Sequence, residues 1–271
     1  GPLGGAAASA KILGLDTYKT QMALGIAASR TGGLTANTGT MVKSTHPGNA
    51  ARMGVESALL ARSGYTASDA ILETSRGYAD ALFNGDMDWD VVVGGLGDPY
   101  RLVDPGFDIK RFPAQVYMQN PIEAVLNLRD KYSLNAEMVR ELVLRTSGRG
   151  HSGSLPKTGL DGKFSVEYCA ASALLDGEVV IDSFTDDRRF SSGMENMLAK
   201  IRVETDGLDS DPVIATALLQ DGRTVSDECG KFTGSAGNPM SRQQRMAKVQ
   251  DCMSRVLDES SGADMVNMIE D

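Results

Sequence analysis

The spacing of apolar residues changes twice along these 271 residues, and this change constrains the fold more than any single motif. Up to about residue 134 the sequence predicts helices rich in alanine and glycine. The next hundred residues also predict strands, including a hairpin that turns at Asp221-Gly222. From a capping box at Ser241 onwards the chain is again expected to be helical. The sequence therefore predicts an α+β fold, with a mainly helical domain formed by residues 1–134 and 236–271 and an inserted, smaller, lid-like α+β domain at 135–235.

Composition excludes several classes of function. A net charge of −9 without basic runs argues against a nucleic-acid or membrane-surface binder. No apolar run approaches the roughly 20 residues that span a bilayer, and no secretion signal is visible. Cys169, Cys229 and Cys252 lie far apart without C-x-x-C spacing, which is typical of reduced thiols in an intracellular protein, here expected to be cytoplasmic. With two histidines in the chain, a His-rich metal site is not expected.

A Gly/Thr-rich loop within residues 39–54 carries Lys43 and His46 directly before a predicted helix. Pro47 suits the first turn of that helix, because its missing N–H has no partner to lose there. A helix N-terminus with a lysine and a protonated histidine beside it favours a carboxylate or another small anion. A solvated surface loop would carry the same residues, so the chemistry alone leaves both interpretations open.

Two further patterns concern the helices near this loop. Small residues from Gly48 to Ala58, including Gly54, give the helix a surface that another helix can approach closely. A second capping box, Thr66-x-x-Asp69, predicts a helix that runs to about Phe83.

Two later segments add cations. Lys110 and Arg111 precede Phe112-Pro113 and could clamp a carboxylate, but the pattern by itself favours an exposed basic turn. The segment 149–163 is long and rich in glycine and serine, which favours a mobile lid or binding loop. It contains His151, Lys157 and Lys163.

Three runs of residues together resemble the MmgE/PrpD family. They are Gly39-Thr-Met-Val-Lys-Ser-Thr-His-Pro-Gly-Asn-Ala-Ala-Arg-Met-Gly54, Lys110-Arg-Phe-Pro113 and Lys157-Thr-Gly-Leu-Asp-Gly-Lys-Phe-Ser-Val-Glu-Tyr168. They occur in the family's order, and the resemblance extends over essentially the whole chain. The family includes 2-methylcitrate dehydratase, cis-aconitate decarboxylase and iminodisuccinate epimerase.

The resemblance implies a helical domain with an inserted α+β domain, and an active site in the cleft between them. It also implies a cofactor-independent enzyme that acts on di- or tricarboxylic acids by moving a proton next to a carboxylate, usually as a homodimer. By position, Lys43 is similar to the family's active-site lysine, with His46 beside it as the second catalytic candidate. The expected substrate-binding residues are Lys110, Arg111, His151, Lys157 and Lys163.

Two departures from the family pattern qualify the expected reaction. Gln115, Gln119 and Phe164 stand where the decarboxylase branch has histidines, so dehydration of the 2-methylcitrate type or epimerisation is expected rather than decarboxylation. The family also has a segment before the point at which this chain begins, and that segment carries active-site residues. An alternative expectation is therefore a chain that is catalytically incomplete without an N-terminal partner segment. Uncovered helix faces would then favour self-association, and a localisation in the mitochondrial matrix is expected if the source is eukaryotic.

Overall fold

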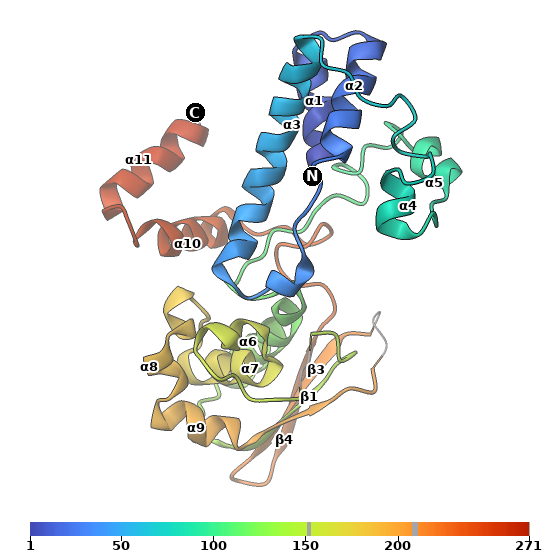
Figure 1. Cartoon of the computed structure of the whole chain (residues 1–271). Coiled ribbons are helices and arrows are strands. Elements are labelled where there is room, and N and C mark those ends of the chain that lie inside the picture. Colours follow the sequence, from blue (N-terminus) through green and yellow to red (C-terminus); the bar gives the residue numbers. More distant parts are fainter. Residues whose placement is uncertain (151–152, 208–210, 271) are drawn as a thin grey trace. The chain divides into compact units, whose positions relative to one another are not determined.

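The computed structural model describes residues 1–150, 153–207 and 211–270, and its α+β fold with mainly helical content confirms the predicted fold class. The chain divides into two compact units, Gly1–Pro99 and Tyr100–Asp271. The predicted grouping of residues 236–271 with 1–134 stays a prediction. Each unit is described by itself (Figure 1).

The first unit is built on three helices that lie side by side: α1 (Pro2–Ile12), α2 (Thr17–Ala28) and α3 (His46–Arg62) (Figure 1). Their core consists mainly of alanine, which allows close helix packing. Gly54 of α3 lies against Gly5 of α1 so closely that a Cβ at position 54 would be 2.5 Å from the Gly5 carbonyl carbon. The predicted small-residue face of this helix is therefore confirmed.

The capping-box prediction at Thr66 is wrong, because residues 66–77 form turns and bends rather than a helix. Backbone groups of this segment bind α2 instead: the Ala67 N–H donates to Met22 Sδ, and the Asp69 carbonyl accepts from Gln21 Nε2 at 2.7 Å. Tertiary hydrogen bonds have thus replaced helical ones. Two short helices follow, α4 (Tyr78–Phe83) and α5 (Trp89–Gly94).

The second unit contains a four-stranded sheet with the order β2-β1-β3-β4. Strand β1 (Val139–Arg145) pairs in parallel with β2 (Ile201–Glu204) and antiparallel with β3 (Val213–Leu219). The antiparallel pair of β3 with β4 (Thr224–Cys229) turns at Asp221-Gly222, which confirms the predicted hairpin. Alternate residues of β3 are buried, as a sheet with one covered face requires.

Helices α6 (Gln119–Tyr132) and α7 (Val166–Asp176) pack against the sheet and each other (Figure 1). In the core between them Tyr168 is fully buried and donates its hydroxyl to the Ser183 carbonyl oxygen at 2.6 Å. Burial raises the pKa of this phenol to about 12. Shorter elements complete the unit: η3 (Val116–Met118), η4 (Leu160–Phe164), η5 (Ile181–Phe184), α8 (Asp186–Arg189) and α9 (Ser192–Leu198).

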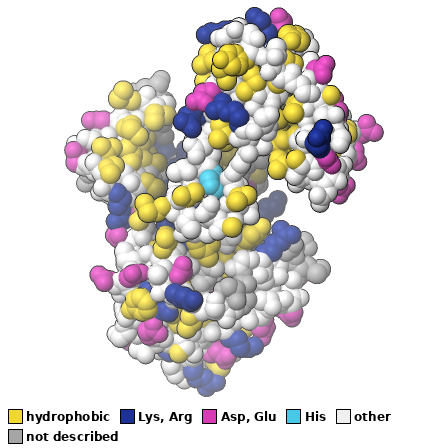
Figure 2. Space-filling view, in the orientation of Figure 1, with side chains coloured by type: hydrophobic (Ala, Val, Ile, Leu, Met, Phe, Trp, Pro, Cys, Tyr) yellow, Lys and Arg dark blue, Asp and Glu magenta, His cyan; other side chains and the backbone are white. Residues whose placement is uncertain are grey.

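The chain ends in α10 (Arg242–Met253) and α11 (Glu259–Glu270), and the predicted capping box at Ser241 is confirmed. Hydrophobic side chains lie on the surface of this C-terminal segment (Figure 2). Among them are Met268 and Ile269 on α11 and Val256 in the turn between the two helices. None of the helices that the structure describes is both long enough and apolar enough to cross a membrane.

Candidate functional site

In the first unit, Lys43 lies on the short 3-10 helix η2 (Met41–Thr45), immediately before α3, and its side chain is exposed. Pro47 occupies the first turn of α3, as predicted. The His46 ring is half-buried beneath Gly33, where a Cβ would lie 3.3 Å from the ring atoms Cγ and Nδ1. Gly33 also has a φ of +97°. A glycine therefore suits this position for two reasons: it has no Cβ to meet the ring, and it adopts a positive φ without strain. The two predicted catalytic residues are therefore adjacent at one helix N-terminus.

In the second unit, a single buried side chain organises the segment from Arg111 to Gln115. The Gln119 amide accepts from the Phe112 N–H at 3.0 Å and donates to the carbonyl oxygens of Phe112 and Gln115 at 3.1 and 3.4 Å. Gln119 is fully buried, so these bonds replace contacts with water. Both ends of the Gln119 side-chain amide are therefore bonded to the backbone of residues 112–115.

The side chain of Gln115 faces a cavity of about 540 Å³, which we call the Lys157 cavity. Its amide oxygen is buried and accepts no hydrogen bond from the described residues, an arrangement that favours a donor on a bound molecule. The φ of Gly150 is +74°, and its backbone lies so near that a Cβ would be 2.9 Å from this oxygen. The lining consists of Gln115, Gly150, Ser154, Leu155, Pro156, Lys157, Asp161, Phe164 and Ser165.

The loop that carries Lys157 is anchored on both sides of that residue. Arg189, a buried side chain, donates from Nε to the Pro156 carbonyl oxygen at 2.7 Å and pairs with Glu195. On the other side, the Gly159 N–H donates to Asp186 Oδ1 at 2.7 Å. The backbone is therefore fixed while the Lys157 side chain stays exposed at the cavity.

Of the predicted substrate-binding residues that the structure describes, Lys110, Arg111 and Lys163 do not line this cavity. Arg111 lines a separate cavity beside α10, described below, and its guanidinium lies 4.8 Å above the centre of its neighbour Phe112's ring. Lys163 reaches the Phe184 ring, 5.5 Å from its centroid, while its carbonyl oxygen accepts from the Gln115 N–H at 2.9 Å. Lys110 is exposed, and His151 lies outside the described residues. Within this unit the structure thus separates Arg111 from Lys157.

The titratable groups at the Lys157 cavity, among its described lining residues, are Lys157 and Asp161. Gln115 and Phe164 stand at positions where the resemblance would place histidines, and neither side chain transfers protons at ordinary pH. A lysine and an amide can bind a carboxylate and orient a hydroxyl. No group of three or more His, Cys, Asp and Glu side chains in the described part of the chain is arranged to hold a metal ion.

Sequence reasoning missed Asp161, Ser165 and the clamping role of Gln119. Asp161 lies within the family-like run from Lys157 to Tyr168, and its Oδ2 accepts from the Thr158 N–H at 3.0 Å. Ser165 caps α7 by accepting from the Tyr168 N–H at 3.2 Å, a role that its position before an apolar run could have indicated. The Gln119 clamp had no comparable signal, because it depends on a turn seven residues away.

Comparison with known proteins identifies the class to which this fold and these motifs belong. Residues 1–90 match the MmgE/PrpD N-terminal domain, and residues 112–271 match the MmgE/PrpD C-terminal domain. The chain therefore belongs to the MmgE/PrpD family.

Curated relatives at moderate identity are named for a lyase reaction. Cis-aconitate decarboxylase of Homo sapiens is 27% identical over 281 residues, which cover 100% of this chain and 58% of the relative. The enzyme of the same name from Mus musculus is 27% identical over 284 residues (100% of this chain, 57% of the relative). That of Aspergillus terreus is 28% identical over 291 residues (98% and 59%). The family is thus of the lyase type, and the chain spans less than three fifths of the length of these relatives.

Proposed function

We propose that the chain belongs to a cofactor-independent lyase that acts on a di- or tricarboxylic acid, most like 2-methylcitrate dehydratase. The observation that carries this proposal is the Lys157 cavity, which Lys157 and Gln115 line together. The amide oxygen of Gln115 is buried and accepts no hydrogen bond from a described residue, so it has an acceptor to offer a bound molecule. A carboxylate would pair with Lys157, and a hydroxyl would donate to Gln115. A hydroxy acid offers both groups.

The proposed reaction is an elimination of water. A base removes a proton from the carbon next to a carboxylate, and the electron pair of that C–H bond forms a carbon–carbon double bond. The neighbouring C–O bond breaks, and the departing hydroxyl takes up a proton from a general acid and leaves as water. We assign carboxylate binding to Lys157, and to Lys43 either carboxylate binding or proton transfer, with His46 beside it. The first unit by itself leaves Lys43 exposed, so a base role for this amine requires further residues around it.

Decarboxylation of cis-aconitate is the second candidate, because the relatives above carry that name. Two features of the second unit argue against decarboxylation and so favour dehydration. Gln119 and Phe164 stand where the decarboxylase branch has histidines, and neither can replace a histidine in proton transfer. The Gln119 amide is bonded to the backbone of residues 112–115, and Phe164 places an aromatic ring at the Lys157 cavity. Epimerisation of an iminodisuccinate-like acid is a further alternative. It would use the same proton transfer next to a carboxylate but would release no water.

The remaining alternative is a chain that is catalytically incomplete by itself and acts with a further segment, or as one subunit of a self-associated, homodimeric enzyme. We further propose that the enzyme is cytoplasmic, or in the mitochondrial matrix if eukaryotic, and that it binds neither nucleic acid nor membranes, as its net charge of −9 favours.

A substrate screen tests these alternatives. 2-Methylcitrate, citrate, cis-aconitate and iminodisuccinate are each incubated with the chain and with the whole product of its gene. Loss of water is detected from the new olefinic proton signals by NMR, and decarboxylation from released CO2. The proposal expects dehydration of a hydroxy acid. Release of CO2 from cis-aconitate without any dehydration would establish the second candidate instead.

A further inference from the structure

A second cavity in the same unit is separate from the Lys157 cavity. It measures about 170 Å³ and lies between α10 and the turn that follows α7, and we call it the Lys248 cavity. At roughly 30 Å³ per water molecule, this is the space of five or six waters, enough for a small organic acid. Its walls combine apolar and charged side chains: Phe112, Leu126, Val179, Arg111, Lys248 and Asp251.

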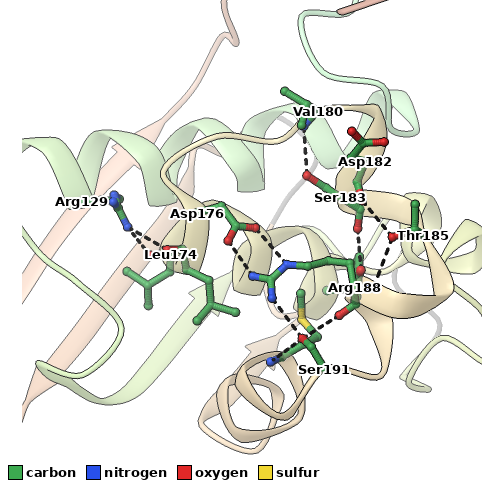
Figure 3. A network of polar contacts seen from close by, with 12 residues as sticks. Arg129, Leu174, Asp176, Val180, Asp182, Ser183, Thr185, Arg188 and Ser191 are labelled. Carbon is green, nitrogen blue, oxygen red and sulfur yellow. Dashed lines mark hydrogen bonds and ion pairs between the residues drawn. The ribbon is translucent and has the colours of Figure 1, made fainter. Parts of the chain in front are cut away.

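The turn that forms one wall of this cavity is rigidly held. The Val180 N–H donates to Ser183 Oγ at 3.1 Å, and Asp176 at the end of α7 pairs with Arg188 at 2.7 Å (Figure 3). Helix α10 is joined to the turn by the Ile181 N–H, which donates to Asp251 Oδ2 at 3.0 Å. The cavity is therefore bounded by fixed backbone on both sides.

Two cations at this cavity have unused hydrogen-bond donors. Lys248 is half-buried and forms neither an ion pair nor a hydrogen bond with the described residues. Arg111 lies 3.8 Å from Glu123 Oε1, beyond hydrogen-bond distance, and Glu123 already accepts from the Thr233 N–H and hydroxyl. An arginine and a lysine beside one small cavity favour an anionic group.

The carboxylates at the cavity do not neutralise these cations. Asp251 Oδ2 accepts from the Ile181 N–H, and Arg255 reaches Asp251 Oδ1 at 3.1 Å. Glu178 lines the cavity but is exposed and forms no ion pair with a described residue, so water screens its charge. Lys248 has no ion-pair partner among the described residues, and the ion pair of Arg111 with Glu123 leaves its hydrogen-bond donors unused. Such cations beside apolar walls are the features of a site for an organic anion.

We infer that the Lys248 cavity binds a small organic carboxylate of about four to six carbons, with its carboxylate at Lys248 and Arg111 and its chain against Phe112, Leu126 and Val179. Nothing in this inference depends on the proposed reaction, because Lys157 and Gln115 line the other cavity. Bound there, such an acid would connect α10 to the turn at residues 177–180.

The chain supplies its own reporter for this site. Cys252 is exposed and lines the cavity, whereas Cys169 and Cys229 are buried. Burial also raises the pKa of Cys169, and that of Cys229 to about 12, which keeps both as unreactive thiols. Alkylation of the chain by neutral iodoacetamide is therefore expected at Cys252, and its rate is measured by mass spectrometry with and without added ligand.

Butyrate is the probe, and its uncharged analogue butanol and inorganic phosphate are the comparison ligands. Butyrate is expected to slow alkylation of Cys252 saturably, and calorimetry should give the same dissociation constant. Lys248→Gln should weaken binding by about tenfold, the loss of one charge-assisted hydrogen bond. Lys231→Gln, which removes an exposed lysine outside this cavity, should change nothing, and Glu178→Gln should leave affinity unchanged or increase it.

Four results would overturn the assignment. These are no protection by butyrate, equal protection by butanol, equal protection by phosphate, or unchanged butyrate binding in Lys248→Gln. Weaker binding in Glu178→Gln would also contradict it, because a ligand that needs Glu178 carries a positive group. Circular dichroism of each variant separates lost binding from lost folding, and Ala247→Leu, which fills the cavity from α10 without changing charge, should abolish protection.

Discussion

Replacement of Gln119 by methionine tests how the second unit holds the segment between its two cavities. The substitution keeps a long side chain in the core but removes the amide. Two of the three backbone groups that it serves keep another partner: the Phe112 carbonyl accepts from the Ala114 N–H at 2.8 Å, and the Gln115 carbonyl from the Met118 N–H at 3.0 Å. The Phe112 N–H has no other partner among the described residues. One orphaned buried donor costs about 1–3 kcal/mol, so we expect a loss of about 2 kcal/mol.

This loss is measured as a change in the free energy of unfolding of the second unit in urea. Unfolding is monitored by hydrogen-exchange mass spectrometry on peptides of α6 and β1. A peptide that contains Phe112 should also lose protection at this amide before the unit unfolds. Gln243→Met is the matched control, because Gln243 is exposed on α10 and the same atoms change. If Gln119→Met and Gln243→Met unfold with the same free energy, the amide clamp does not stabilise the segment and the reasoning is refuted.

Three further predictions concern other parts of the fold. Gly54→Ala should destabilise the first unit by about 1–3 kcal/mol, since its Cβ would meet the Gly5 backbone, whereas Gly48→Ala should not; thermal unfolding compares them. Tyr168→Phe should cost about 1–2 kcal/mol in urea unfolding, because the buried Ser183 carbonyl loses its donor; a cost near zero would contradict the bond. Hydrogen bonds from Ser260 and Ser261 lower the pKa of Asp258 from 3.8 to about 2. The resulting stabilisation of α11 is present above pH 3.8 and is lost as the pH falls to about 2. NMR chemical shifts of residues 260–269 should show fraying in that window, and Asp258→Asn should abolish this pH dependence.

The fold was predictable wherever local signals decide structure. Asp221-Gly222 predicted the hairpin of β3 and β4, because turn chemistry acts over a few residues. The capping box at Ser241 was confirmed for the same reason. Thr66 carried an equally good local signal and failed, because the backbone at Ala67 and Asp69 binds α2. A local pattern cannot reveal a tertiary partner that competes for the same backbone groups.

The candidate site was predictable only in part. The family motifs indicated Lys43, His46 and Lys157, and the structure places Lys157 at a cavity with Gln115. The separation of Arg111 from Lys157 was not predictable, because it depends on the directions of two side chains of the 111–115 segment. Arg111 lines the Lys248 cavity, whereas Gln115 lines the Lys157 cavity. That segment is set by Gln119, whose role becomes visible only when α6 and the turn before it are seen together.

The most direct test of the proposed function is the turnover of 2-methylcitrate and citrate by the whole gene product and its Lys157→Gln variant, followed by NMR. Lys231→Gln serves as the control, since it removes an exposed lysine that lines neither cavity. The account predicts that a hydroxy acid loses water and that Lys157→Gln raises KM by about tenfold or more, as the loss of a charge-assisted contact requires. Turnover that is unchanged in Lys157→Gln, or absent with every hydroxy acid, would contradict it.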